Sequence, residues 1–177
     1  MRKIVYYVAV SMDGFIEGPD KSSDKFIHEP SIVDYYLNDL KNFDTTIMGR
    51  NTYENGYKYG LEPGLAPYPH MQHYIFSNTL SFSNVNDRMK VLKPDLKYIY
   101  ELQKGNGTDI YLCGGGIFAG WLLDNELIDV LKLKLNPVIL GGDTRLFGSS
   151  SKSLFLDLME SLDFDNGFKI LTYNIKY

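Results

Sequence analysis

Two segments of the chain share one pattern: a short apolar run, then glycine, then residues with helical character. The first spans residues 47–52, with Gly49 at its centre, and the second spans residues 112–119 and contains three consecutive glycines. A short apolar run between turn signals indicates a buried strand, and glycine permits a tight turn from strand to helix. Strands that alternate with helices are typical of α/β proteins.

The rest of the chain continues this alternation. Residues 4–10 form an unbroken run of β-branched and aromatic residues, which suits a strand buried on both faces. Residues 74–77 and 129–138 are also strand-like, while helical spacing follows Pro30 and returns over residues 94–104. We therefore expect helices between the strands of one sheet.

The C-terminal tail, residues 161–177, carries Asn166-Gly167 between two strand-like runs, which predicts an antiparallel hairpin. The chain of 177 residues shows no internal repeat and no low-complexity linker. We expect one domain over residues 1–177, with a three-layer α/β/α fold, a mostly parallel central sheet and a C-terminal antiparallel hairpin.

Composition and charge exclude several classes of partner. Lys and Arg total 18 against 22 acids, without a basic stripe, so we expect no nucleic acid partner. One cysteine, Cys113, allows no intrachain disulfide and no CxxC metal framework, so we expect no metal site. No run approaches the roughly 20 apolar residues of a membrane span, and the apolar run near the N-terminus is too short for a signal peptide. We expect a cytoplasmic protein.

The two glycine turns are candidate phosphate sites. The free N–H groups at a helix start attract anions, and Arg50 and Thr52 would add a guanidinium and a hydroxyl. The alternative is a plain turn with a surface arginine. In the second turn Gly114, Gly116 and Ala119 match the spacing of a dinucleotide fingerprint, but the acid that should follow it is absent. Two such turns in one small domain indicate a dinucleotide ligand.

Five ordered segments resemble one superfamily over nearly the whole chain. Met48-Gly49-Arg50-Asn51-Thr52-Tyr53-Glu54 resembles the cofactor motif of dihydrofolate reductases, Ile75-Phe76-Ser77-Asn78 resembles the strand end at their adenosine site, and Gly114-Gly115-Gly116 resembles their glycine turn. Residues 10–16 and 131–143 are similar to the reductase domain of bacterial riboflavin biosynthesis and its uncharacterised relatives.

The resemblance implies NADPH as the cofactor, with Arg50 at its 2′-phosphate. It also implies a cis peptide bond between Gly114 and Gly115. Gly49, Arg50 and Thr52 would lie near the phosphates, and Ala9 and Ile16 near the nicotinamide. The full set of cofactor residues that it implies is Ala9, Ile16, Gly49, Arg50, Asn51, Thr52, Ser77, Asn78, Cys113, Gly114, Gly115, Gly116 and Ile117.

Two acids are candidate catalytic residues. Dihydrofolate reductases carry an acid in the first helix after a Trp-x-Leu-Pro segment, which residues 26–30 do not match. Asp34 is the nearest acid; alternatively it completes a capping box that begins at Ser31. Asp13 would bind substrate or close a turn with Gly14.

Other residue types receive structural interpretations. Cys113 is expected to pack at a strand end, and His28, His70 and His73 are expected to be exposed loop residues. Many of the 14 tyrosines fall in the first helix and the following excursion, where they would flank the substrate or a homodimer interface. These residues are Tyr35, Tyr36, Tyr53, Tyr57, Tyr59 and Tyr68.

The sequence as a whole predicts an NADPH-dependent oxidoreductase. The expected reaction is hydride transfer to a C=N or C=O carbon of a small substrate, either a pterin-like or pyrimidine ring or a phosphorylated ribosylamino compound. The alternatives are a strict dihydrofolate reductase and a non-catalytic NADP-binding protein.

Overall fold

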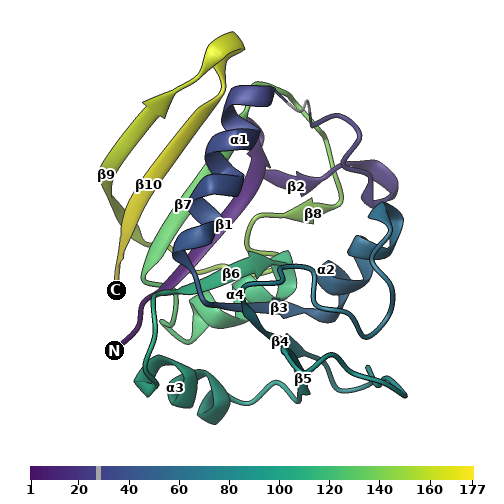
Figure 1. The fold of residues 1–177 in the computed structure, drawn as a ribbon. Helices are drawn as coiled ribbons and strands as arrows, with labels where there is room; N and C mark the ends of the chain where they lie inside the picture. Colours follow the sequence, from purple (N-terminus) through teal and green to yellow (C-terminus); the bar gives the residue numbers. More distant parts are fainter. Residues whose placement is uncertain (27–28) are drawn as a thin grey trace.

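The central sheet has eight strands, six of them parallel (Figure 1). The computed structural model describes residues 1–26 and 29–177. Across the sheet the order is β5 (Met89–Leu92), β4 (Gln72–Phe76), β3 (Thr45–Gly49), β6 (Ile110–Gly114), β1 (Ile4–Ser11), β7 (Val130–Asn136), β10 (Lys169–Lys176) and β9 (Phe155–Asp163). The strands from β5 to β7 are parallel, and β10 is antiparallel to both neighbours. The predicted fold class is confirmed.

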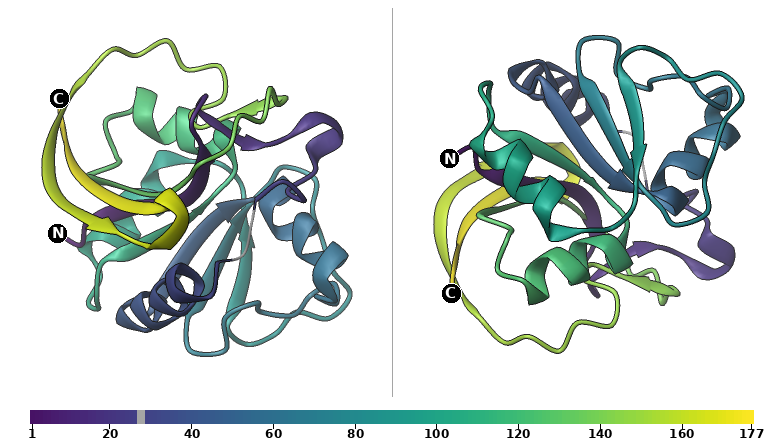
Figure 2. Two further views of the ribbon diagram at one scale, coloured as in Figure 1. Left: turned by 90° about the horizontal axis from the view of Figure 1, so that it is seen from above. Right: turned by 90° about the horizontal axis from the view of Figure 1, so that it is seen from below.

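Helices cover both faces of this sheet. They are α1 (Pro30–Asp39), α2 (Arg50–Asn55), α3 (Leu96–Lys104) and α4 (Gly116–Asp124), with short 3₁₀ helices η1 (Pro19–Lys21), η2 (Leu40–Asn42), η3 (Gly56–Tyr59) and η4 (Asp165–Gly167). In α1, Ile32 packs in one cluster with Tyr7, whereas Leu122 of α4 packs with Tyr6 on the other face. The two tyrosines are neighbours on β1, so their side chains point to opposite faces. The α3 and α4 helices lie side by side on the second face (Figure 2).

The start of α1 differs from the predicted capping box. The carboxylate of Glu29 accepts hydrogen bonds from the backbone N–H of Ile32, at 3.1 Å, and from the hydroxyl of Ser31. Glu29 is therefore the N-cap and Pro30 opens the helix, where its missing N–H costs nothing. Asp34 takes no part in the cap, so the capping-box interpretation is wrong.

The parallel arrangement brings distant segments to one edge. Because β4, β3, β6, β1 and β7 run in the same direction, the residues at their C-terminal ends lie along the same side of the sheet. We call this side the carboxyl edge. Ligands of open α/β sheets bind outside the carboxyl ends of the strands.

The sequence pattern does not predict several elements that the structure contains. Strands β2 (Phe15–Glu17) and β8 (Thr144–Arg145) form a separate antiparallel pair, and β9 begins at Phe155, six residues before the predicted tail. Two or three residues are too few to show an alternation, and β9 is exposed along most of its length.

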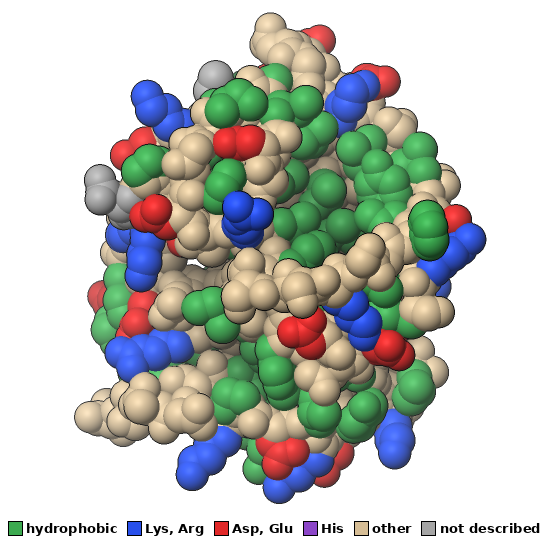
Figure 3. All heavy atoms as spheres, turned by 180° about the vertical axis from the view of Figure 1, so that it is seen from behind, with side chains coloured by type: hydrophobic (Ala, Val, Ile, Leu, Met, Phe, Trp, Pro, Cys, Tyr) green, Lys and Arg blue, Asp and Glu red, His purple; other side chains and the backbone are tan. Residues whose placement is uncertain are grey.

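Apolar side chains gather on the back of the molecule, on the side where β9 and β10 lie (Figure 3). The described residues 1–26 and 29–177 contain no helix with the length and apolar character of a membrane span.

Candidate cofactor and substrate site

The glycine turn after β6 leads directly into α4. Gly114 and Gly115 have φ values of 137° and 94°, a region that residues with a Cβ rarely adopt. The peptide bond between them is trans. The predicted cis bond is therefore wrong: two consecutive glycines with positive φ make this turn with a trans bond.

The two glycine turns touch each other at the carboxyl edge. A Cβ placed on Gly115 would lie 2.9 Å from the hydroxyl oxygen of Thr52, and one on Gly49 would lie 3.2 Å from the Cβ of Phe118. A Cβ on Gly114, in contrast, would meet nothing closer than 3.9 Å. The turns that follow β3 and β6 thus close on each other, with Gly114 buried and Gly115 half-buried.

Arg50 links α2 to the segment that follows β4. Its Nε donates to the Glu54 carboxylate at 2.8 Å, and its Nη1 donates to the Thr79 hydroxyl at 2.7 Å. The buried Ser77 hydroxyl accepts hydrogen bonds from the N–H groups of Thr79 and Leu80. The structure therefore brings Arg50 next to the strand end predicted to border the adenosine.

The first turn of α4 exposes an apolar side chain. Ile117 is 74% exposed, although Phe118 and Ala119, which follow it, are buried. An exposed isoleucine beside the glycine turn offers an apolar surface to the ring of a ligand. Asn51 and Asn78 are also exposed at the carboxyl edge.

The predicted nicotinamide end lies at β1 and β6. Ala9 and Ile16 are half-buried, Ala9 on the face of β1 that α1 covers and Ile16 in β2. Cys113 packs at the end of β6, where the Tyr68 hydroxyl lies 3.6 Å from its Sγ. Burial raises the pKa of the Cys113 thiol, which agrees with packing rather than with a nucleophilic thiolate.

Asp13 holds a neighbouring loop. Its carboxylate accepts hydrogen bonds from the N–H groups of Leu140, at 3.0 Å, and Gly141, at 2.8 Å, and from the Ser11 hydroxyl at 2.6 Å. These bonds, the one from Leu140 first, lower the pKa of Asp13 to about 2. The geometry supports a structural role for Asp13, and its catalytic role stays a prediction.

Asp34 lies on the outer side of α1. The side chain is exposed, whereas Tyr36, two residues further along the helix, reaches the sheet. Residues two apart on a helix point to different sides, so the structure does not bring Asp34 to the carboxyl edge together with Ala9. Its catalytic role also stays a prediction.

A group of phenols between α1 and the sheet was not singled out as a site by the sequence. The hydroxyls of Tyr36 and Tyr111 lie 2.6 Å apart, and the ring of Tyr7 meets that of Tyr36 edge-to-face at 4.9 Å. Above the same face, β7 places two half-buried lysines, Lys132 and Lys134. The sequence feature that could have pointed to the two lysines is their position in an otherwise apolar strand.

The histidines differ from the prediction. His73 lies on β4 and is buried, and its Nε2 accepts a hydrogen bond from the Tyr68 N–H at 3.1 Å, so an exposed loop position is wrong for it. Burial lowers the pKa of His73 to about 4. His70 is exposed, as predicted, and His28 lies outside the described residues.

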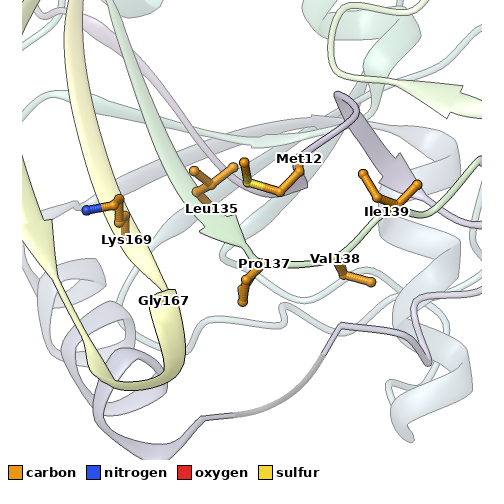
Figure 4. Close-up of a pocket in the computed structure, with 7 residues that line it drawn as sticks. All are labelled: Met12, Leu135, Pro137, Val138, Ile139, Gly167 and Lys169. Atoms are coloured by element: carbon orange, nitrogen blue, oxygen red, sulfur yellow. The ribbon is translucent and has the colours of Figure 1, made fainter.

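A separate hollow of about 310 Å³ lies beyond the end of β7 (Figure 4). Its lining is mostly apolar and comprises Met12, Leu135, Pro137, Val138, Ile139, Gly167 and Lys169. Leu135 points to the face of the sheet opposite Lys134, its neighbour on the strand, and Lys169 is ion-paired with Asp163. We therefore do not assign the substrate to this hollow.

The fold and the carboxyl edge define a class: the protein has the dihydrofolate reductase-like fold, with two glycine turns at the ends of adjacent parallel strands. More narrowly, the chain belongs to the RibD C-terminal domain family, whose model it matches over residues 2–170.

Individual relatives agree with this assignment. The uncharacterized protein YyaP of Bacillus subtilis is 28% identical over 183 residues, which cover 98% of this chain and 95% of that protein. A putative riboflavin biosynthesis protein from Shewanella has the same fold, with a TM-score of 0.82, 24% identity and full coverage of both chains. The dihydrofolate reductase of Enterococcus faecalis, solved in complex with NADP(H), has a TM-score of 0.72 at 17% identity, over 99% of this chain and 97% of that one. The family is reductase-like and related to riboflavin biosynthesis.

Proposed function

We propose that the protein is an NADPH-dependent reductase. It transfers hydride to a C=N or C=O carbon of a small substrate, which is a pterin-like or pyrimidine ring or a phosphorylated ribosylamino compound. The reductase-like family supports this proposal, as does the shared fold with a dihydrofolate reductase that binds NADP(H).

One observation carries the proposal: three predicted cofactor segments meet at neighbouring strand ends. Ser77 follows β4, Gly49 ends β3, and the glycine turn follows β6, and these three strands are adjacent. Ala9 lies on β1, the next strand along. An extended dinucleotide laid along this edge would have its adenosine near β4, its phosphates near β3 and β6, and its nicotinamide near β1.

The residues at this edge fit NADPH. The N–H groups at the start of α4 would bind a phosphate, and Arg50 presents a guanidinium, held by Glu54 and Thr79, near the adenosine end. NADPH supplies the hydride when it is bound. The chain's own contribution is to hold the two reactants at the distance and orientation that hydride transfer needs, and to keep water from the reacting carbon.

A strict dihydrofolate reductase receives less support. That reaction needs an acid from the first helix at the substrate, and Asp34 is exposed on the outer side of α1. Following NADPH absorbance after adding dihydrofolate tests this alternative, and we expect no oxidation above the rate without dihydrofolate.

Thermal unfolding with and without nucleotide tests cofactor binding. With a micromolar dissociation constant, NADPH at 100 times that concentration should stabilise the protein by about 2.7 kcal/mol. NADP⁺ should behave similarly and NADH should give a smaller shift. The absence of any shift with NADPH and NADP⁺ would overturn the proposal, and a shift without turnover on any reducible substrate would favour a non-catalytic NADP-binding protein.

Two exposed isoleucines provide a matched pair of variants. Ile117 lies beside the glycine turn and is 74% exposed, whereas Ile139 is 72% exposed and lines the separate hollow. The Ile117→Ala variant should bind NADPH about tenfold more weakly, since roughly half of the burial energy of an isoleucine is lost. The Ile139→Ala variant should bind NADPH like the wild type; equal effects in both variants would count against the assigned edge.

A further inference from the structure

Lys134 occupies the sheet position beside the predicted nicotinamide contact. In the parallel pairing of β1 with β7, Lys134 is the register partner of Ala9, so the two side chains lie on the same face. This face is the one that α1 covers, and the Lys134 ammonium lies 5.2 Å from the ring centre of Tyr36 on that helix. Ala9 and Lys134 are both half-buried.

Among the residues that the structure describes, Lys134 has no counter-ion, unlike its neighbour Lys132. Lys132, two residues earlier on the same face, is ion-paired with Asp39 of α1. Within residues 1–26 and 29–177, Lys134 forms no ion pair, and the groups around it from α1 and β1 are phenols. Burial alone lowers the pKa of Lys134, with no contribution from a carboxylate. A half-buried ammonium without a counter-ion is costly for a fold, so it calls for a reason.

Several buried polar groups on this face lack partners among the described residues, and two of them lie on the strands of Ala9 and Lys134. The Tyr7 hydroxyl, on β1 two residues before Ala9, and the Asn136 side-chain oxygen, on β7 two residues after Lys134, are buried and have no hydrogen-bond partner among the described residues. Buried polar atoms are nearly always hydrogen-bonded, so an unpaired one calls for an explanation, such as a bound water or ion. Among the described residues, Lys134, the Tyr7 hydroxyl and the Asn136 side-chain oxygen therefore lie on one face of two adjacent strands without the partners that a bound polar molecule would supply.

We propose that Lys134 determines substrate specificity by binding an acidic group, a carboxylate or a phosphate, on the substrate. This proposal rests on the proposed reductase function and narrows its substrate class to anions. A desolvated ammonium binds an anionic oxygen much more strongly than a solvated one does, because the local dielectric constant is low. A neutral ring would accept at most a hydrogen bond from Lys134 and would leave it without a counter-ion.

Paired probes that differ in one acidic group test this inference. Binding of each probe is measured by thermal unfolding and calorimetry in the presence of saturating NADP⁺. The three pairs, each a neutral probe and its acidic counterpart, are uracil and orotate, pterin and pterin-6-carboxylate, and ribose and ribose 5-phosphate. We expect the acidic member of at least one pair to bind the wild type more tightly than its neutral partner. The Lys134→Met variant should lose that preference, with at least about a tenfold weaker affinity for the acid, and Lys134→Arg should keep most of it.

A second lysine serves as the control. Lys90 on β5 also lies over a tyrosine ring, with its Nζ 6.0 Å from the centre of the Tyr74 ring. Its side chain is exposed, and β5 lies at the edge of the sheet, far from the strand that carries Ala9. The Lys90→Met variant should bind every probe like the wild type. Equal binding of acidic and neutral members, no binding of any acid, or unchanged acid binding in Lys134→Met would overturn the inference. A normal NADPH shift in the same samples would leave the proposed function intact.

The ligand-free stability of Lys134→Met distinguishes recognition from a structural role. The folded state holds the Lys134 proton less tightly than the unfolded chain, since its pKa lies below 10.5. Stability of the wild type relative to the variant should therefore rise as the pH increases from the lowered pKa towards 10.5. At neutral pH the variant should be at least as stable as the wild type, and a clear loss of stability would indicate that Lys134 is structural.

Discussion

Asp13 and Asp34 illustrate how far single residues can be interpreted from sequence. Both were candidate acids, and the sequence left a turn or a cap as the alternative for each. The structure gives Asp13 three donors from Leu140, Gly141 and Ser11, which no local pattern could reveal because two of them lie more than 120 residues away. Asp34 is solvent-exposed, and Glu29 has the capping role.

The Asp13→Asn variant should therefore be less stable than the wild type. A neutral amide is a weaker acceptor for the N–H groups of Leu140 and Gly141. Because the pKa of Asp13 falls from 3.8 to about 2 on folding, its stabilising contribution is complete above pH 3.8 and is lost as the pH falls through about 2.

Thermal unfolding between pH 2 and pH 7 measures this effect. Asp13→Asn should lower the Tm at pH 7, and its difference from the wild type should shrink towards pH 2. The exposed Asp34 supplies the control, since Asp34→Asn should leave the Tm unchanged. Equal effects of the two substitutions would contradict the structural role of Asp13.

At the scale of elements, glycine and apolar runs predicted most of the sheet. The turns after β3 and β6, the hairpin and three of the helices follow from residue types alone, because each has a strong local signal. The pairing of β2 with β8 and the phenols between α1 and the sheet depend on which segments meet in space. Alternation could place Lys134 on a face of its strand, but only the packing of α1 shows that no described residue serves as its counter-ion.

The start of α4 should tolerate no side chain at Gly116. A Cβ there would lie 2.3 Å from the carbonyl oxygen of Arg145 and 3.1 Å from the N–H nitrogen of Gly148, both backbone atoms. Gly116→Ala should lower the free energy of unfolding by about 1–3 kcal/mol, the usual cost of overpacking. Urea unfolding checks this value. A Cβ on Gly105 would make only ordinary contacts, so Gly105→Ala should change stability little, and equal losses would refute the argument.

At the scale of the whole molecule, the predicted homodimer stays a prediction, as do cytoplasmic location and the absence of nucleic acid and membrane partners. The tyrosines do not form one exposed patch: Tyr53 is buried, Tyr36 and Tyr68 face the sheet, and Tyr59 is exposed. Apolar exposure is instead marked on β9, where Phe155 is 86% and Leu158 is 57% exposed. Light scattering measures the molar mass in solution, and comparison with the chain mass of 20.2 kDa shows whether the protein forms a dimer.

Calorimetric titration of NADPH and NADH into the wild type and Arg50→Ala tests the central claim most directly. The wild type should bind NADPH at least about tenfold more tightly than NADH, because a guanidinium binds a phosphate through charge-assisted hydrogen bonds. Arg50→Ala should lose most of that preference, with NADH affinity little changed. An equal loss for both nucleotides would remove Arg50 from the 2′-phosphate, and the absence of NADPH binding to the wild type would contradict the cofactor site at the carboxyl edge.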